Sequence, residues 1–179
     1  MSRPDGKKIA FLALMTALAM ILSYVESLLP FTGFLPGFKV GLANLVTLFL
    51  LYRVRPSEAF LVTLLRVIAL SVLFGNVTGF VFSLAGFLAS FGAMALLKKT
   101  GKFHVISVSV TGGVVHNLAQ IAAAFFLIGT PGLGFYGAHL SLLGALSGCV
   151  IGILGAVLVK RIRLPLLEEK SADDRSDGK

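Results

Sequence analysis

Long runs of hydrophobic residues, separated by short polar or glycine- and proline-containing stretches, dominate the pattern along the chain. A membrane-spanning helix needs about 20 mostly apolar residues, with a usual range of about 17–25. Six runs reach or approach that length: Ile9 to Leu29, Phe38 to Tyr52, Pro56 to Phe74, Val77 to Leu97, His104 to Ile128 and Tyr136 to Val159. The pattern therefore predicts an all-α integral membrane protein with six transmembrane helices. The second run is the weakest, because it is short and follows Pro36-Gly37.

Lysine and arginine residues alternate with the hydrophobic runs in a way that indicates their orientation. All of them except Lys39 and Arg66 precede the first run, lie between the second and third or the fourth and fifth, or follow the sixth. Six crossings place these groups on one side of the membrane, whereas an odd number would scatter them. The positive-inside rule makes that side the cytoplasm, so we expect both termini there.

The composition favours a membrane protein over a soluble domain. Hydrophobic residues make up 56% of the 179 residues and charged residues 13%, about half the charged fraction of a soluble domain. We expect a cytoplasmic N-terminus over residues 1–8, a six-helix membrane domain over 9–163, and a charged, disordered cytoplasmic tail over 164–179. The first run is too long for a typical signal peptide and is expected to be retained. The net charge of +8 follows mainly from the topology and is not interpreted as nucleic-acid binding.

Small residues recur three or four positions apart in two of the runs. The fourth run carries Gly79, Ser83, Gly86, Ser90 and Ala93, and the sixth carries Gly137, Ser141, Gly144, Gly148, Gly152 and Ala156. This spacing places them on one face of a helix, where two backbones can approach closely. We interpret both stripes as packing surfaces within the monomer.

Polar residues within the predicted helices gather in the outer half of the membrane. They are Glu26, Lys39, Asn44, Arg66, Ser83, His116, Asn117 and Gln120. Arg66 lies near mid-membrane, where a charge costs at least about 2.5–3.5 kcal/mol on insertion scales and therefore faces a cavity or a partner. Lys39 and Arg66 are natural donors to anionic groups. The pattern predicts a binding pocket for a small anionic or phosphate-containing solute.

A purely structural interpretation of the same residues remains open. Glu26 could pair with Lys39 or Arg66, and the amide side chains could hold the helices together by hydrogen bonds. In that case the protein would be a membrane scaffold without a ligand site.

The signatures of several enzyme classes are missing from the sequence. There is no Gly-x-x-x-x-Gly-Lys-Ser/Thr loop for ATP hydrolysis, and no His-Glu-x-x-His motif or cysteine pair for a metal. The single cysteine, Cys149, lies inside an apolar run and cannot form an intrachain disulfide. The clustered aspartates that hold magnesium and diphosphate in a prenyl synthase are absent where a substrate could be enclosed. We therefore expect no enzymatic activity, no catalytic residue, no metal site and no cofactor.

Three sequence motifs carry a resemblance to a known family. They are PGFKVGLAN at 36–44, FSLAG at 82–86 and GGVVHNLAQ at 112–120. Together they resemble the bacterial Gx transporter family, also labelled heptaprenyl diphosphate synthase component I, over about residues 8–165. That family in turn looks like the S components of energy-coupling factor (ECF) transporters, six-helix proteins that bind vitamins or other micronutrients.

The resemblance implies a function and a set of partners. The opening Leu12 to Leu18 is similar to the first helix of S components, so Ala13 and Ala17 would dock on an ECF coupling subunit, with separate ATPase subunits supplying the energy. The chain would then be the substrate-binding subunit of an importer in the bacterial cytoplasmic (inner) membrane. The label "component I" gives the alternative, a non-catalytic membrane subunit associated with heptaprenyl diphosphate synthesis for isoprenoids or quinones.

Overall fold

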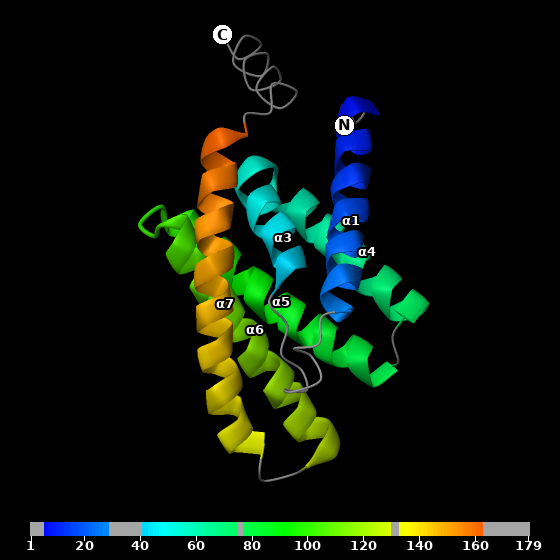
Figure 1. Cartoon of the computed structure of the whole chain (residues 1–179), viewed down its shortest axis with the longest axis vertical. Coiled ribbons are helices and arrows are strands. Elements are labelled where there is room, and N and C mark those ends of the chain that lie inside the picture. Colours follow the sequence, from blue (N-terminus) through cyan, green and yellow to red (C-terminus); the bar gives the residue numbers. More distant parts are fainter. Residues whose placement is uncertain (1–5, 29–40, 75–76, 130–132, 163–179) are drawn as a thin grey trace.

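The computed structural model describes residues 6–28, 41–74, 77–129 and 133–162, and in this part of the chain the regular structure is entirely helical. The helices are α1 (Gly6–Ser27), α3 (Leu42–Arg53), α4 (Pro56–Phe74), α5 (Val77–Thr100), α6 (Val105–Ile128) and α7 (Leu133–Arg161) (Figure 1). Lys39, the first external loop and the predicted tail at 164–179 lie outside the described residues. The tail and the domain boundaries therefore stay predictions.

Five of these helices, α1, α4, α5, α6 and α7, are long and apolar enough to cross a membrane. The prediction of an all-helical, multi-pass membrane protein is confirmed at this level. The remaining helix, α3, has 12 residues and rises only about 18 Å at 1.5 Å per residue, less than the roughly 30 Å thickness of a bilayer core. The predicted count of six crossings is therefore not established.

Glycines in the left-handed backbone region mark several helix boundaries. Gly41 has a φ of 86° and precedes α3, which explains why that helix begins at Leu42. Gly129 has a φ of 68° and follows α6, where its N–H donates to the carbonyl of Phe125. At the end of α6 this bond satisfies a terminal helix carbonyl, in a backbone conformation that residues other than glycine rarely adopt.

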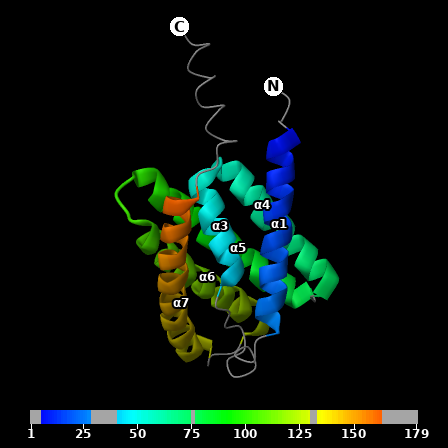
Figure 2. The same cartoon turned by 45° about the horizontal axis from the view of Figure 1, so that its top comes forward.

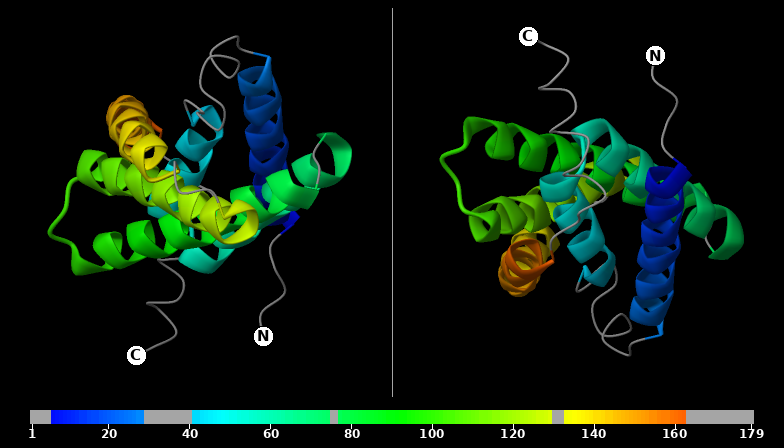
Figure 3. Two further views of the ribbon diagram at one scale, coloured as in Figure 1. Left: turned by 90° about the horizontal axis from the view of Figure 1, so that it is seen from below. Right: turned by 90° about the horizontal axis from the view of Figure 1, so that it is seen from above.

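The helices form two groups that meet along α3. In the first group α1 packs against α3 and α4, and in the second α6 packs against both α5 and α7. Contacts between α3 and α7 and between α4 and α5 join the groups. In every view α3 lies between α1 and α7 (Figures 1, 2 and 3). Its side chains Leu48, Leu50 and Leu51 are fully buried and form the centre of the core.

The closest helix contact joins α6 and α7 through glycines. A Cβ atom added to Gly113 would lie 2.3 Å from the carbonyl oxygen of Gly144. Added Cβ atoms at Gly148 and Gly152 would each lie 2.9 Å from the Cα of an α6 residue. The prediction that the small residues of the sixth run pack within the monomer is confirmed.

Basic residues from different loops gather at one end of the bundle. Lys8 at the start of α1 forms an ion pair with Glu58 at the start of α4, at 2.7 Å. Arg53 at the end of α3 donates to the carbonyls of Val159 and Ile162 at the end of α7. The start of α1 and the end of α7 lie at the same end in Figure 1. This arrangement fits the predicted common side, and its assignment to the cytoplasm stays a prediction.

Candidate functional site

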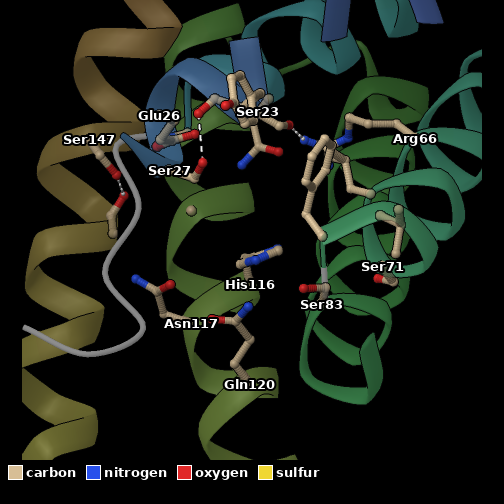
Figure 4. A pocket seen from close by; sticks show the side chains of 18 residues that line it. Ser23, Glu26, Ser27, Arg66, Ser71, Ser83, His116, Asn117, Gln120 and Ser147 are labelled. Carbon is tan, nitrogen blue, oxygen red and sulfur yellow. Dashed lines mark hydrogen bonds between the residues drawn. The ribbon is translucent and has the colours of Figure 1, made fainter. Parts of the chain in front are cut away.

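A cavity of about 290 Å³ lies between the two helix groups. Its volume is close to the lower limit of small-molecule sites, about 300–1,000 Å³. Seven of the eight residues predicted from the sequence line it: Glu26, Asn44, Arg66, Ser83, His116, Asn117 and Gln120. Figure 4 labels all of these except Asn44. The eighth, Lys39, lies outside the described residues. Helices far apart in the sequence thus bring the predicted polar residues to one site, and their role in binding stays a prediction.

Arg66 is the buried cation of this cavity. It lies about midway along α4 and is only 9% exposed. One terminal nitrogen donates to the hydroxyl of Ser23 at 3.2 Å, but Nε has no hydrogen-bond partner within the described residues. Glu26 is near enough to act on Arg66 electrostatically, but the two side chains form no ion pair within the described residues. A buried guanidinium without a paired carboxylate is costly unless an anion reaches it.

Glu26 connects the end of α1 to the start of α3. The side chain is 5% exposed, and its Oε1 accepts a hydrogen bond from the N–H of Gly41 at 2.5 Å. Because Gly41 is the residue before α3, this bond fixes where α3 begins relative to α1. Glu26 therefore has a structural role in addition to facing the cavity. The alternative pairing of Glu26 with Lys39 lies outside the described residues.

Three residues of α6, His116, Asn117 and Gln120, form one wall of the cavity. The amide nitrogen of Asn117 donates to the carbonyl of Leu140 in α7 at 2.6 Å. The structural interpretation of the amides as bonds between helices therefore holds for Asn117. Gln120 has no hydrogen bond within the described part of the chain, so its amide is available to the cavity. Asn117 thus contributes to packing while Gln120 can meet a ligand.

The imidazole of His116 lies against the backbone of Gly86 in α5. A Cβ atom at Gly86 would be 2.7 Å from Cε1 of His116, and Nδ1 lies 3.5 Å from the hydroxyl of Ser90. We expect Gly86→Ala to push the ring toward the cavity and to lower the melting temperature. The double variant Gly86→Ala/His116→Ala should recover much of the loss, which thermal unfolding in detergent would measure. Equal melting temperatures for Gly86→Ala and the double variant would contradict the close contact between Gly86 and His116.

Sequence reasoning missed several residues of the cavity. They are Ser23, Tyr24, Ser27, Gly41, Val67, Leu70, Ser71, Phe74, Gly113, Gly144 and Ser147. A signal existed for two of them, because Ser23 lies three positions before Glu26 on the same helix face, and Ser27 lies four positions after Ser23. The ring centroids of Tyr24 in α1 and Phe74 in α4 lie 5.2 Å apart, and both side chains line the cavity.

Metal ligands are not assembled in the described part of the chain. No group of three or more His, Cys, Asp or Glu side chains lies together there. The cavity therefore offers one buried arginine, one buried glutamate and neutral amides, hydroxyls and an imidazole. This set can hold a small polar molecule by charge and by hydrogen bonds.

The helices and the polar site between them define a multi-pass helical membrane protein with a polar cavity. A family model described as heptaprenyl diphosphate synthase component I matches residues 15–158, and the chain belongs to this family. The family predicted from the three motifs is thereby confirmed, and its name implies a partner component. Comparison with curated proteins and with solved structures gives no match.

Proposed function

We propose that the protein is the substrate-binding subunit, or S component, of an ECF-type importer for a small anionic or phosphate-containing micronutrient. A vitamin or a cofactor precursor belongs to this class. One observation carries the proposal: Arg66 is buried in the cavity with its Nε unpaired within the described residues. An anionic group of a solute would supply the missing partner, with charge-assisted hydrogen bonds to the guanidinium.

The other cavity residues would form hydrogen bonds to the neutral parts of the solute. Gln120, Asn44 and Ser83 provide neutral hydrogen-bonding groups on three different helices. His116 and Asn117 line the wall of α6, and Lys39 would add a second cation. Glu26 orients the start of α3 and can accept a bond from a donor on the solute. Neutral groups of this kind give direction and selectivity, and the cation gives charge complementarity.

The exposed face of α1 is suited to docking on a partner helix. Both Ala13 and Ala17 are exposed, and their large neighbours Leu14 and Leu18 are 63% and 39% exposed. Small residues four positions apart allow another helix to approach closely in a membrane. Under the proposal this face docks on the ECF coupling subunit, and ATPase subunits drive the transport cycle.

We expect Ala17→Trp to prevent co-purification of a coupling subunit without unfolding the protein. The bulky ring can point away from the bundle because Ala17 is exposed, but it would hold a partner helix apart. Ala122→Trp is the matched control, since Ala122 is exposed on α6 and away from this face. Affinity purification from a bacterial membrane, followed by protein identification, measures both variants. Undiminished coupling-subunit recovery with Ala17→Trp would contradict docking through this face.

Native mass spectrometry of the gently extracted protein tests the central proposal. A retained small acid, or an ECF module that travels with the protein, is the expected result. A prenyl synthase partner without any small ligand would instead favour the second candidate function.

The second candidate is a non-catalytic membrane subunit associated with heptaprenyl diphosphate synthesis, and the family name favours it. In either case we propose that the chain is not itself an enzyme and lies in the bacterial cytoplasmic membrane. Adding the purified chain to a prenyl synthase distinguishes the two functions, because only the accessory subunit would raise the synthase rate.

A further inference from the structure

A small recess continues the cavity toward the basic end of the bundle. It has a volume of about 20 Å³ and shares Gly41, Asn44, Gly113 and Ser147 with the main cavity. Its other lining residues lie closer to the basic end on every helix, as Ser90 does relative to Ser83 in α5 and Ser109 relative to Gly113 in α6. The site is therefore a main chamber with a narrow deeper end.

The deeper end is polar although it is buried. Ser90 and Ser109 are each 6% exposed, and the amide of Asn44 and the hydroxyl of Ser147 also line it. Ser90 and Ser147 donate to carbonyls of their own helices, Phe87 and Gly144. The hydroxyl of Ser109 and the side-chain amide of Asn44 make no hydrogen bond within the described part of the chain. Neither group is among the fully buried unpaired atoms of the described residues, so both can take a hydrogen-bond partner in the recess.

The recess has the size of one small polar group. A cavity of about 10–15 Å³ is enough for a water-sized occupant, so a hydroxyl or an amide N–H fits and a longer branch does not. Gly112, Gly113 and Gly148 narrow it without adding side chains, and Met94 and Ile151 help to close it. An alkyl group in this place would leave Ser109 and Asn44 unpaired, which is unfavourable.

We propose that the recess selects a small acid whose opposite end carries a hydroxyl or an amide. This inference rests on the proposed function, because it places the acid group at Arg66. Arg66 and Ser147 line the same cavity and lie on opposite sides of it (Figure 4), so a molecule that contacts both must span the cavity. The acid group binds to the guanidinium of Arg66 by charge, and the hydroxyl or amide at the other end forms hydrogen bonds with Asn44 and Ser109 in the recess.

Matched pairs of small acids test this selectivity on the full-length protein in detergent. The pairs are para-hydroxybenzoate and benzoate, gamma-hydroxybutyrate and butyrate, and hydroxyethyl phosphate and ethyl phosphate. We expect the hydroxylated member of at least one pair to bind about tenfold more tightly than its partner, the gain expected of one buried hydrogen bond. Titrations of the melting temperature measure the affinities. Phenol, which has the hydroxyl and no acid group, should bind far more weakly.

Ser109→Ala should abolish the difference in affinity between the two acids of that pair, because it removes the hydroxyl that bonds to the neutral end of the ligand. Ser107→Ala is the matched control, since Ser107 lies on the same helix and is exposed; it should preserve the difference. Equal affinities for the two acids of every pair would contradict the proposed selectivity of the recess, and so would a difference in affinity that persists in Ser109→Ala. Neither result would contradict the anion site at Arg66. If no acid in the panel binds in an Arg66-dependent manner, the proposed function fails together with the recess.

Discussion

Arg66→Met is expected to weaken the binding of the retained solute by about 10–100-fold, while the protein becomes equally or more stable. Loss of a charged hydrogen-bond donor costs roughly 1.5–3 kcal/mol of binding. The methionine also removes a costly buried charge that forms no ion pair within the described residues. Glu26, which acts on Arg66 electrostatically, keeps its hydrogen bond from the N–H of Gly41. Native mass spectrometry of the retained solute and thermal unfolding of the same sample measure the two effects.

The opposite signs of these two effects make the experiment specific. Arg55→Met is the matched control, because Arg55 is exposed at the basic end and is replaced by the same residue. It should leave both retention and melting temperature close to those of the unmodified protein. If Arg66→Met retained the solute fully, the assignment of the cavity as an anion site would be wrong. A large loss of stability would mean that Arg66 supports the fold.

Gly113→Ala is expected to lower the free energy of unfolding by about 1–3 kcal/mol, the usual cost of overpacking. The added methyl group would meet the carbonyl oxygen of Gly144 at 2.3 Å. Because that neighbour is backbone, no change of rotamer can relieve the overlap, and α6 and α7 must move apart. Thermal or denaturant unfolding in detergent measures the loss.

Gly92→Ala provides the matched control for this substitution. Gly92 also lies inside a helix, α5, but an added Cβ would meet nothing within 4 Å. The same change there should be neutral or stabilise the protein by about 0.5–1 kcal/mol, since alanine favours a helix more than glycine does. Equal effects of the two substitutions would show that the close contact between α6 and α7 is not a source of stability.

The sequence allowed much of the cavity to be predicted because ionisable and amide residues are rare in membrane helices. Arg66 and Glu26 attracted attention for this reason, and both line the same cavity. The serines were harder to predict, because a serine in a helix commonly bonds to its own backbone. Ser27 and Ser147 do so, to the carbonyls of Tyr24 and Gly144, and yet they still face the cavity.

Other features depend on tertiary packing that a local pattern does not carry. Asn117 bonds to α7 whereas Gln120 does not, because the packing of α6 against α7 brings the carbonyl of Leu140 near Asn117. The sequence around Asn117 does not contain this information. The recess at Ser109 likewise exists only because four helices meet there. The short α3 was anticipated as the weakest run, but its start at Leu42 depends on the backbone conformation of Gly41.

The shortness of α3 has a consequence for how the protein is made. The other five helices could each enter the bilayer as independent apolar segments, whereas α3 is too short to span it alone. Seven of the 12 residues of α3 are buried and the other five are partly buried, so its place in the membrane depends on the neighbouring helices. Biogenesis should therefore end with a cooperative assembly step around α3, and nascent chains that stop before α7 should leave this segment accessible to water-soluble labelling reagents.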